Sequence, residues 1–186
     1  MFEQILIFDK ELLLLINGAN NQLFDMIMLF ISSKLGWIPL YLLLLFFIIK
    51  DYGTKTWLVL VIVALTVLLA DQISVQLFKN TFQRLRPCHD ESLAGLLHMA
   101  KSCGGKFGFI SSHATNSFGI TALVILLLRK KHVWIWAVML LYGFLIIYSR
   151  VYLGVHYPTD VATGALVGSS IGLLTYLLFK FINKRI

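Results

Sequence analysis

Long apolar runs dominate this chain, and polar residues interrupt them at few places. A helix needs about 20 mostly apolar residues to cross the hydrocarbon core of a bilayer, and several of the runs approach or exceed that length. The pattern therefore predicts an all-α membrane protein, a bundle of about five to six transmembrane helices. The expected spans are residues 23–49, 57–78, 115–128, 133–148 and 161–182.

Two of the expected spans depart from a plain apolar run. Polar residues 32–34 and Pro39 interrupt span 23–49, which predicts a bent helix because proline cannot continue the helical hydrogen bonds. Span 115–128 is short, so we expect its helix to begin near residues 111–113 and to lie partly within the protein.

The last span carries glycine at every fourth position, at Gly164, Gly168 and Gly172. Small residues at that spacing let two helices approach closely inside a membrane. We therefore expect this span to pack tightly against a neighbouring helix.

The N-terminal residues predict a different kind of element. Residues 2–16 mix charged side chains with large apolar ones and end at the polar stretch 17–21. We predict that residues 1–22 form a helix lying in the membrane interface. The start lacks the basic region and cleavage site of a secretory signal, so we expect nothing to be removed. We interpret residues 1–186 as a single membrane-embedded domain.

Composition supports a membrane environment and argues against nucleic acid as a partner. The chain is 59% hydrophobic and 13% charged, whereas soluble domains carry about 25% charged residues. The net charge of +7 comes from basic residues at the ends of apolar runs. No basic stripe is interleaved with aromatic residues, as nucleic-acid binding would require. The bilayer is the partner that these features indicate, and they do not indicate an oligomeric state.

Three polar stretches, residues 79–87, 110–113 and 149–160, lie at the ends of expected spans. Because consecutive spans alternate in direction, all three reach one membrane surface. Taken singly, their basic residues could be interfacial anchors, their serines helix caps and their histidines packed polar groups. Ionisable residues at membrane depth are costly and usually functional, so their joint occurrence indicates a site.

The side chains of these stretches suit a phosphate. Lys79, Arg86 and Arg150 supply three cationic donors, and each arginine can engage two oxygens. The helix that begins near residues 111–113 offers free backbone N–H groups and the positive end of its dipole. Two histidines and one carboxylate then remain, which is enough for covalent phosphoryl transfer without a metal or other cofactor. These three residues are His113, His156 and Asp160.

The basic residues indicate how the chain crosses the membrane. Alternating spans divide the sixteen Lys and Arg into two sets of eight. One set is Lys50, Lys55, Arg129, Lys130, Lys131, Lys180, Lys184 and Arg185, and the other is Lys10, Lys34, Lys79, Arg84, Arg86, Lys101, Lys106 and Arg150. The counts tie, but three members of the second set have a chemical reason to be there. We therefore place the first set in the cytoplasm.

This orientation puts the long polar loop, residues 84–109, outside the cell membrane together with Cys88 and Cys103. An oxidising compartment favours a disulfide between the two cysteines. Two free thiols remain an alternative, as does a metal site completed by His89 and His98, although the spacing matches no compact zinc pattern. We expect the disulfide and no metal.

The motifs resemble the three-part signature of the type 2 phosphatidic acid phosphatase superfamily. The first part matches as Lys79, six residues, then Arg86-Pro87, and the third as Ser149-Arg150, five residues, His156, three residues, Asp160. The second part departs from the usual Pro-Ser-Gly-His, because Ile110 and Ser112 replace Pro and Gly around the matching Ser111 and His113. The signature covers residues 79–160.

The resemblance implies a role for each matching residue. His156 would attack phosphorus and become phosphohistidine, Asp160 would fix its tautomer, and His113 would protonate the departing oxygen. The equatorial phosphate oxygens would be held by Lys79, Arg86, Ser111, Arg150 and the N–H groups near Ser112. Positioned charge of this kind does most of the work of phosphoryl transfer.

The resemblance also implies a lipid phosphate as substrate, because the spans argue against the soluble haloperoxidase branch of the superfamily. The expected protein lies in the inner, or plasma, membrane with its site facing the periplasm or exterior. Within that class the sequence favours a bacterial undecaprenyl pyrophosphate phosphatase. A lipid A phosphatase and a phosphatidylglycerophosphate phosphatase remain alternatives. A transporter for anions or lipid phosphates could also line a cavity with arginine and histidine, but it has no need of paired histidines with an aspartate.

Overall fold

The computed structural model describes residues 2–100 and 102–185. Within these residues every regular element is a helix, and the one β-type pairing is an isolated bridge between Leu85 and Phe107. The main helices are α1 (Phe2–Gly18), α2 (Gln22–Ser32), α3 (Ile38–Tyr52), α4 (Thr56–Gln72), α5 (Asn80–Phe82), α6 (Ser112–Leu128), α7 (Ile135–Tyr152) and α8 (Pro158–Asn183). Shorter turns are the π-helical Ile73–Lys79 and the 3₁₀ segments Leu35–Trp37, Gly53–Lys55, Pro87–His89 and Glu91–Leu93.

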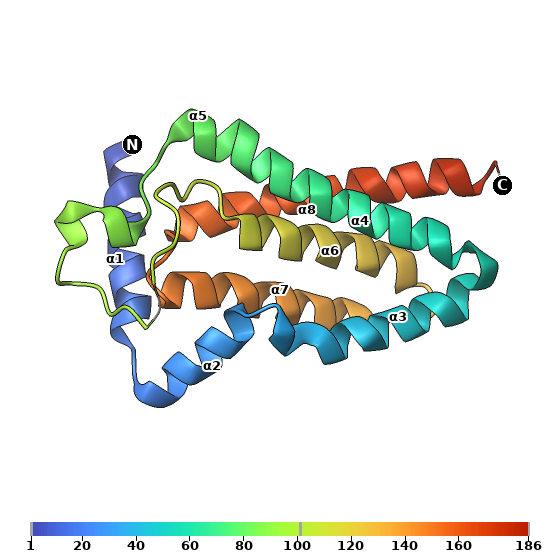
Figure 1. The fold of residues 1–186 in the computed structure, drawn as a ribbon, viewed down its shortest axis with the longest axis horizontal. Coiled ribbons are helices and arrows are strands. Elements are labelled where there is room, and N and C mark those ends of the chain that lie inside the picture. The colour runs from blue at the N-terminus through green and yellow to red at the C-terminus, as the bar shows by residue number, and fades with distance from the viewer. Residues whose placement is uncertain (1, 101, 186) are drawn as a thin grey trace.

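The helices α3, α4, α6, α7 and α8 lie side by side along the length of the molecule, and α1 crosses one end of this bundle (Figure 1). Three segments of the described chain are long and apolar enough to cross a membrane: Leu35–Phe82, Ile135–Tyr152 and Pro158–Asn183. The first has 48 residues, more than one pass of about 20 residues needs. α3 ends at Tyr52 and α4 begins at Thr56, and α4 runs back alongside α3, so the two helices are separate passes (Figure 1). The predicted all-α membrane bundle is confirmed.

The first expected span is not one bent helix. The chain leaves α2 at Ser32 and begins α3 only at Ile38, so the polar break separates two helices. Pro39 occupies the first turn of α3, where its missing N–H is not needed and its fixed φ favours helix initiation. The short third span begins at Ser112, as predicted.

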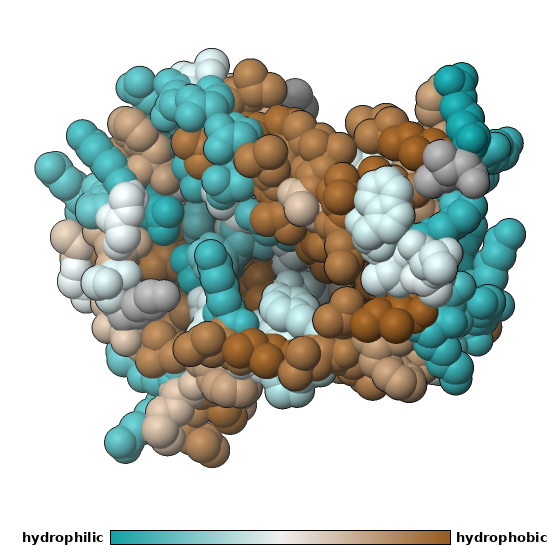
Figure 2. Space-filling view, turned by 45° about the vertical axis from the view of Figure 1, so that its right-hand side comes forward, coloured by the Kyte–Doolittle hydropathy of each residue, from teal (hydrophilic) through white to brown (hydrophobic). Residues whose placement is uncertain are grey.

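The surface reflects the same organisation. Figure 2 shows a brown, apolar middle with a hollow in it, between polar ends. The basic set assigned to the cytoplasm occupies the ends of α3, α6 and α8 and the turn before α4, at the end of the bundle opposite α1 (Figure 1). The orientation relative to the two sides of the membrane stays a prediction.

Tight packing of α6 against α8 uses the glycines of the last span. A Cβ at Gly168 would lie 2.2 Å from the carbonyl oxygen of Thr115, and one at Gly172 would lie 2.4 Å from that of Gly119. Both helices begin at the end of the bundle that α1 crosses and run in the same direction (Figure 1). Their two N-termini are therefore neighbours.

The N-terminal helix is seated on this end of the bundle by one face. Asp9, Leu13 and Asn17, each four residues apart, are buried, whereas Ile7 and Phe8 are exposed. The buried Asn17 amide donates to the carbonyl oxygens of Tyr152, at 2.7 Å, and His98, at 2.8 Å. Thus α1 has an exposed apolar side and a buried side that contacts the rest of the protein, and its position in the membrane interface stays a prediction.

Replacing Gly168 with alanine should separate α6 from α8, because the new methyl would clash with the Thr115 carbonyl. Overpacking of this kind typically costs about 1–3 kcal/mol. Thermal unfolding in detergent should show a clear loss of stability for Gly168→Ala. The matched control is Gly18→Ala, since a Cβ at Gly18 has nothing within 4 Å; equal stability of the two variants would contradict the prediction.

Candidate active site

The three predicted stretches converge at the end of the bundle where α6 and α8 begin. Lys79 closes the π-helical segment, Arg150 lies near the end of α7, and the α7–α8 turn carries His156. Lys79 Nζ donates to Ser112 Oγ at 2.7 Å, which joins the first stretch to the second. The Ser111 N–H donates to the carbonyl oxygen of Asp160 at 3.1 Å, which joins the second to the third.

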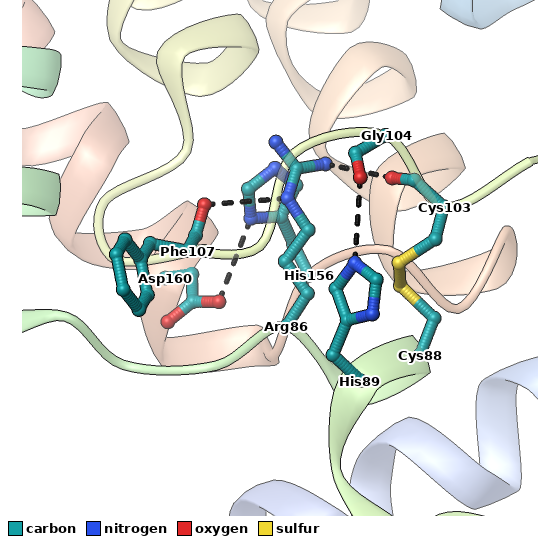
Figure 3. Close-up of a disulfide and its surroundings, with 8 residues drawn as sticks. All are labelled: Arg86, Cys88, His89, Cys103, Gly104, Phe107, His156 and Asp160. Carbon is teal, nitrogen blue, oxygen red and sulfur yellow. Dashed lines mark hydrogen bonds and ion pairs between the residues drawn. A yellow bond between two sulfur atoms is a disulfide. The ribbon is translucent and has the colours of Figure 1, made fainter.

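The start of α8 holds His156 and Asp160 in one local unit. Both side chains are buried, and His156 Nδ1 lies 3.5 Å from Asp160 Oδ2 (Figure 3). The same carboxylate oxygen accepts the Tyr157 N–H at 3.0 Å, as in a capping box. The imidazole–carboxylate distance is long for a hydrogen bond, as is common in active sites before substrate binds.

The electrostatic surroundings of His156 favour its neutral form. Burial holds the pKa of His156 well below its usual range, and the positive charges of Arg150, Arg86 and Lys79 lower that pKa further. A neutral imidazole keeps a free lone pair on one nitrogen, which a nucleophile requires.

Two of the residues predicted to bind phosphate each have a buried polar atom without a hydrogen-bond partner in the protein. Ser111 occupies the N-cap position of α6, yet its side chain makes no capping hydrogen bond. Among the described residues, Ser111 Oγ and Arg150 Nε are buried without a hydrogen-bond partner. Buried polar atoms are nearly always paired, so this arrangement suits a ligand rich in acceptor oxygens. The helix N-terminus adds free N–H groups for an anion.

The loop between α5 and α6 holds Arg86 in position. Its Nε donates to the carbonyl oxygen of Phe107 at 3.3 Å, and its Nη1 donates to that of Cys103 at 3.2 Å (Figure 3). Cys103 is joined by a disulfide to Cys88, two residues beyond Arg86, with 5.9 Å between the Cα atoms. The bridge therefore fastens the two loop strands on either side of the guanidinium.

The four residues of the alternative metal site do not converge. Ligand atoms of Cys88, His89 and Cys103 lie within 4.8 Å of one another, but the two sulfurs are bonded to each other. A metal takes a thiolate, which a disulfide does not offer. His98 is elsewhere, with Nε2 2.8 Å from Asp25 Oδ2.

His113 lies in the first turn of α6, at the wall of a large cavity. The cavity has a volume of about 1010 Å³, and Ser112 and His113 are among its polar lining residues. Away from them it runs between α3, α4, α6 and α7 along apolar side chains, which include Leu44, Ile48, Val63, Val67, Ile120 and Ile146. A hydrocarbon chain could lie there with its polar end beside His113.

The motif reasoning missed two charged residues that touch the site. Arg84 Nη1 donates to Asp160 Oδ1 at 2.8 Å, and Arg84 Nη2 donates to Asp9 Oδ2 at 2.6 Å. Arg84 lies within residues 79–87, the first motif stretch, so the sequence could have identified it as a candidate site residue. Asp9 belongs to the N-terminal helix, where nothing in the sequence marked it apart from the charged residues around it.

Comparisons with known proteins agree with the motif pattern. The family model described as the PAP2 superfamily matches residues 55–184. The chain is 35% identical to the lipid A 4'-phosphatase of Bacteroides thetaiotaomicron, over 100% of this chain and 83% of that protein. It is 36% identical to the lipid A 4'-phosphatase of Porphyromonas gingivalis, over 98% of this chain and 78% of that protein. It is 33% identical to the undecaprenyl-diphosphatase of Sulfolobus acidocaldarius, over 93% of this chain and 79% of that protein. The crystal structure of Aquifex aeolicus LpxE superposes with a TM-score of 0.62 at 28% identity, over 89% of this chain and 92% of that one.

The pH dependence of activity should report the cations around His156. In the unmodified protein the acid limb of kcat/KM should lie well below the ordinary histidine pKa of 6.5. Arg86→Gln removes one positive charge, which raises the pKa of His156 and moves this limb to higher pH. Lys106→Gln is the matched control, because it removes a charge from the same loop that does not act on His156. An acid limb that stays fixed in Arg86→Gln would contradict this electrostatic account.

Proposed function

We propose that this chain, which belongs to the PAP2 superfamily, removes a phosphate from lipid A. The reaction would pass through a phosphohistidine on His156. The chain is a membrane lipid phosphatase, and lipid A is the substrate class that its relatives favour. The observation that carries the chemistry is the fully buried His156, whose Nδ1 lies 3.5 Å from the buried Asp160 carboxylate. Burial and the charges of Arg150, Arg86 and Lys79 lower the pKa of His156 and so favour its neutral form.

In the first step, His156 Nε2 forms a bond to phosphorus while the bond from phosphorus to the lipid oxygen breaks. His113 gives its proton to that departing oxygen, which leaves as a hydroxyl. Asp160 stabilises the positive charge that develops on the His156 ring, in the way that a carboxylate supports a catalytic imidazole. Water then attacks the phosphorus atom and gives a proton to His113, which lost its own in the first step. The phosphorus–nitrogen bond breaks at the same time, so inorganic phosphate leaves and His156 is neutral again.

The charge of the transferring phosphoryl group is spread over its equatorial oxygens, and fixed donors suit it. Lys79, Arg86 and Arg150 supply positive charge, and Ser111 Oγ supplies a buried hydroxyl. Ser112 contributes the N–H at the start of α6, while its side chain accepts from Lys79. Hydrogen bonds to the protein hold these cationic groups, from Lys79 to Ser112 and from Arg86 to the carbonyl oxygens of Phe107 and Cys103, and donors fixed in advance are what makes electrostatic stabilisation effective.

The substrate proposal differs from the one that the sequence alone favours. Two lipid A 4'-phosphatases match nearly the whole chain, whereas undecaprenyl diphosphate is supported by a relative of lower identity. The apolar cavity beside His113 fits a hydrocarbon chain of either lipid. Undecaprenyl diphosphate is therefore the second candidate.

We further propose that the site faces the periplasm or the exterior, where a disulfide persists. The crowded basic residues at the opposite end of the bundle support this orientation. A reporter fused to the C-terminus tests it, because an external C-terminus would invert the arrangement.

Purified protein should release phosphate from lipid A with a higher kcat/KM than from undecaprenyl diphosphate or phosphatidylglycerophosphate. His156→Ala should abolish both turnover and the acid-labile phosphoenzyme. A preference for undecaprenyl diphosphate would overturn the substrate proposal and keep the reaction class. No release from any lipid by folded, unmodified protein would favour a transporter instead.

Removal of the proposed acid should depend on the leaving group. His113→Ala should slow phosphoenzyme formation by about 10²–10⁴-fold for an alkoxide leaving group, which needs a proton. The loss should be much smaller for a nitrophenyl ester, whose leaving group needs little protonation. Rapid-quench measurement of phosphoenzyme with both substrates tests this, and an equal loss with both would remove His113 from that role.

A further inference from the structure

Arg84 lies between two buried carboxylates that come from opposite ends of the chain. Asp160 belongs to α8 and Asp9 to α1, and both side chains are fully buried. Each terminal nitrogen of Arg84 has its own carboxylate, at 2.8 Å for Asp160 and 2.6 Å for Asp9. The ring of Tyr157 supports the guanidinium, with its centroid 4.1 Å from Cζ.

In this arrangement the two carboxylate oxygens of Asp160 have different partners. Oδ1 accepts from Arg84, and Oδ2 faces His156 Nδ1 and accepts the Tyr157 N–H. Gly108 closes another side, because a Cβ there would lie only 3.1 Å from Asp160 Oδ2. The plane of the carboxylate, and so its aim at the imidazole, depends on the bond that Arg84 makes to Oδ1.

Asp9 ties Arg84 to the first turn of α8. Asp9 Oδ1 accepts the backbone N–H of Thr159 at 2.9 Å, and its Oδ2 accepts the Thr159 hydroxyl. A carboxylate is favourable at a helix N-terminus because of the free N–H groups and the helix dipole. Thr159 also accepts from Arg84 Nη1 at 2.7 Å, so Asp9, Arg84 and the start of α8 form one closed network.

The charges of the network explain why its members are needed together. A buried carboxylate without a partner is strongly destabilising, and removing one member of a buried ion pair leaves the other charge uncompensated. Arg84 is the cation that contacts both Asp9 and Asp160. Without it, Asp160 would turn toward the remaining positive groups and away from His156.

We propose that Arg84 and Asp9 are positioning residues, which aim Asp160 at His156 and make α1 part of the catalytic unit. The inference rests on the proposed function, in which His156 is the nucleophile. In this proposal neither residue binds the phosphate, because the hydrogen bonds of their side chains go to each other and to residues at the start of α8. Both act through the carboxylate that orients the imidazole.

A double-mutant cycle separates positioning from a general structural role. Arg84→Gln should lower kcat by about 10- to 100-fold, as loss of an orienting partner commonly does, with little change in KM. In an Asp160→Asn background the same substitution should have no further effect, because the carboxylate on which it acts is gone. The assay uses an activated aryl phosphate as substrate, because its good leaving group keeps the turnover of the slowest variant measurable. Arg84→Lys should recover part of the loss.

Asp9→Asn should lower kcat in the same direction by a smaller factor, and this effect should also vanish in the Asp160→Asn background. The matched control is Lys10→Gln on the next residue of α1. It breaks an ion pair with Asp90, at 3.1 Å, that does not involve Asp160, so kcat should not change. Thermal unfolding and size-exclusion profiles establish that each variant is folded. If Arg84→Gln does not fold, Arg84→Lys takes its place in the cycle.

Losses of equal factor in both backgrounds would overturn the positioning role, since they would show that Arg84 acts independently of Asp160. A loss confined to KM would also overturn it. Failure of the unmodified protein to release phosphate from any lipid is a separate outcome. It would overturn the proposed function, and the positioning role with it.

Discussion

The contact between α6 and α8 is the constraint on which the site depends. Glycines on α8 let its backbone approach the carbonyl groups of α6 more closely than any side chain would permit. Because the two helices run in the same direction, this contact sets two positive helix ends beside each other. One of these ends carries Ser111 and His113, and the other carries Asp160. If the two helices packed less closely, Ser111, His113 and Asp160 would lie too far apart to act on one substrate.

Charges of both signs act on His156. Burial and the positive charges of Arg150, Arg86 and Lys79 lower the pKa of the imidazole, and these cations would repel one another without an anion between them. Asp9 and Asp160 share Arg84, and Asp160 keeps one oxygen facing the ring. The cations suit a phosphate, and the carboxylate suits an imidazolium. The two sets of charges thus favour different stages of one phosphoryl transfer.

The parts that sequence predicted well are those that depend on periodicity or on spacing within one segment. Hydrophobic runs located the helices, and alternation of their direction placed the three motif stretches at one end. The network of Arg84 could not be found in this way, because Asp9 and Arg84 are 75 residues apart and belong to no common pattern. The break after Ser32 was located correctly, but Pro39 proved to start a helix, since proline suits a first turn as well as a kink.

The contacts between α1 and α8 affect the order in which parts of the protein can assemble during synthesis. Asp9 is synthesised early, yet its partner Thr159 follows 150 residues later. Chains emerge from the ribosome N-terminus first, so the contacts of Asp9 with Thr159 can form only after the start of α8 has been made. His156 and Asp160 lie at the start of α8, so they also enter the bundle at that final stage. A chain that stops before α8 carries most of the other helices without the His156–Asp160 pair and without the network of Arg84.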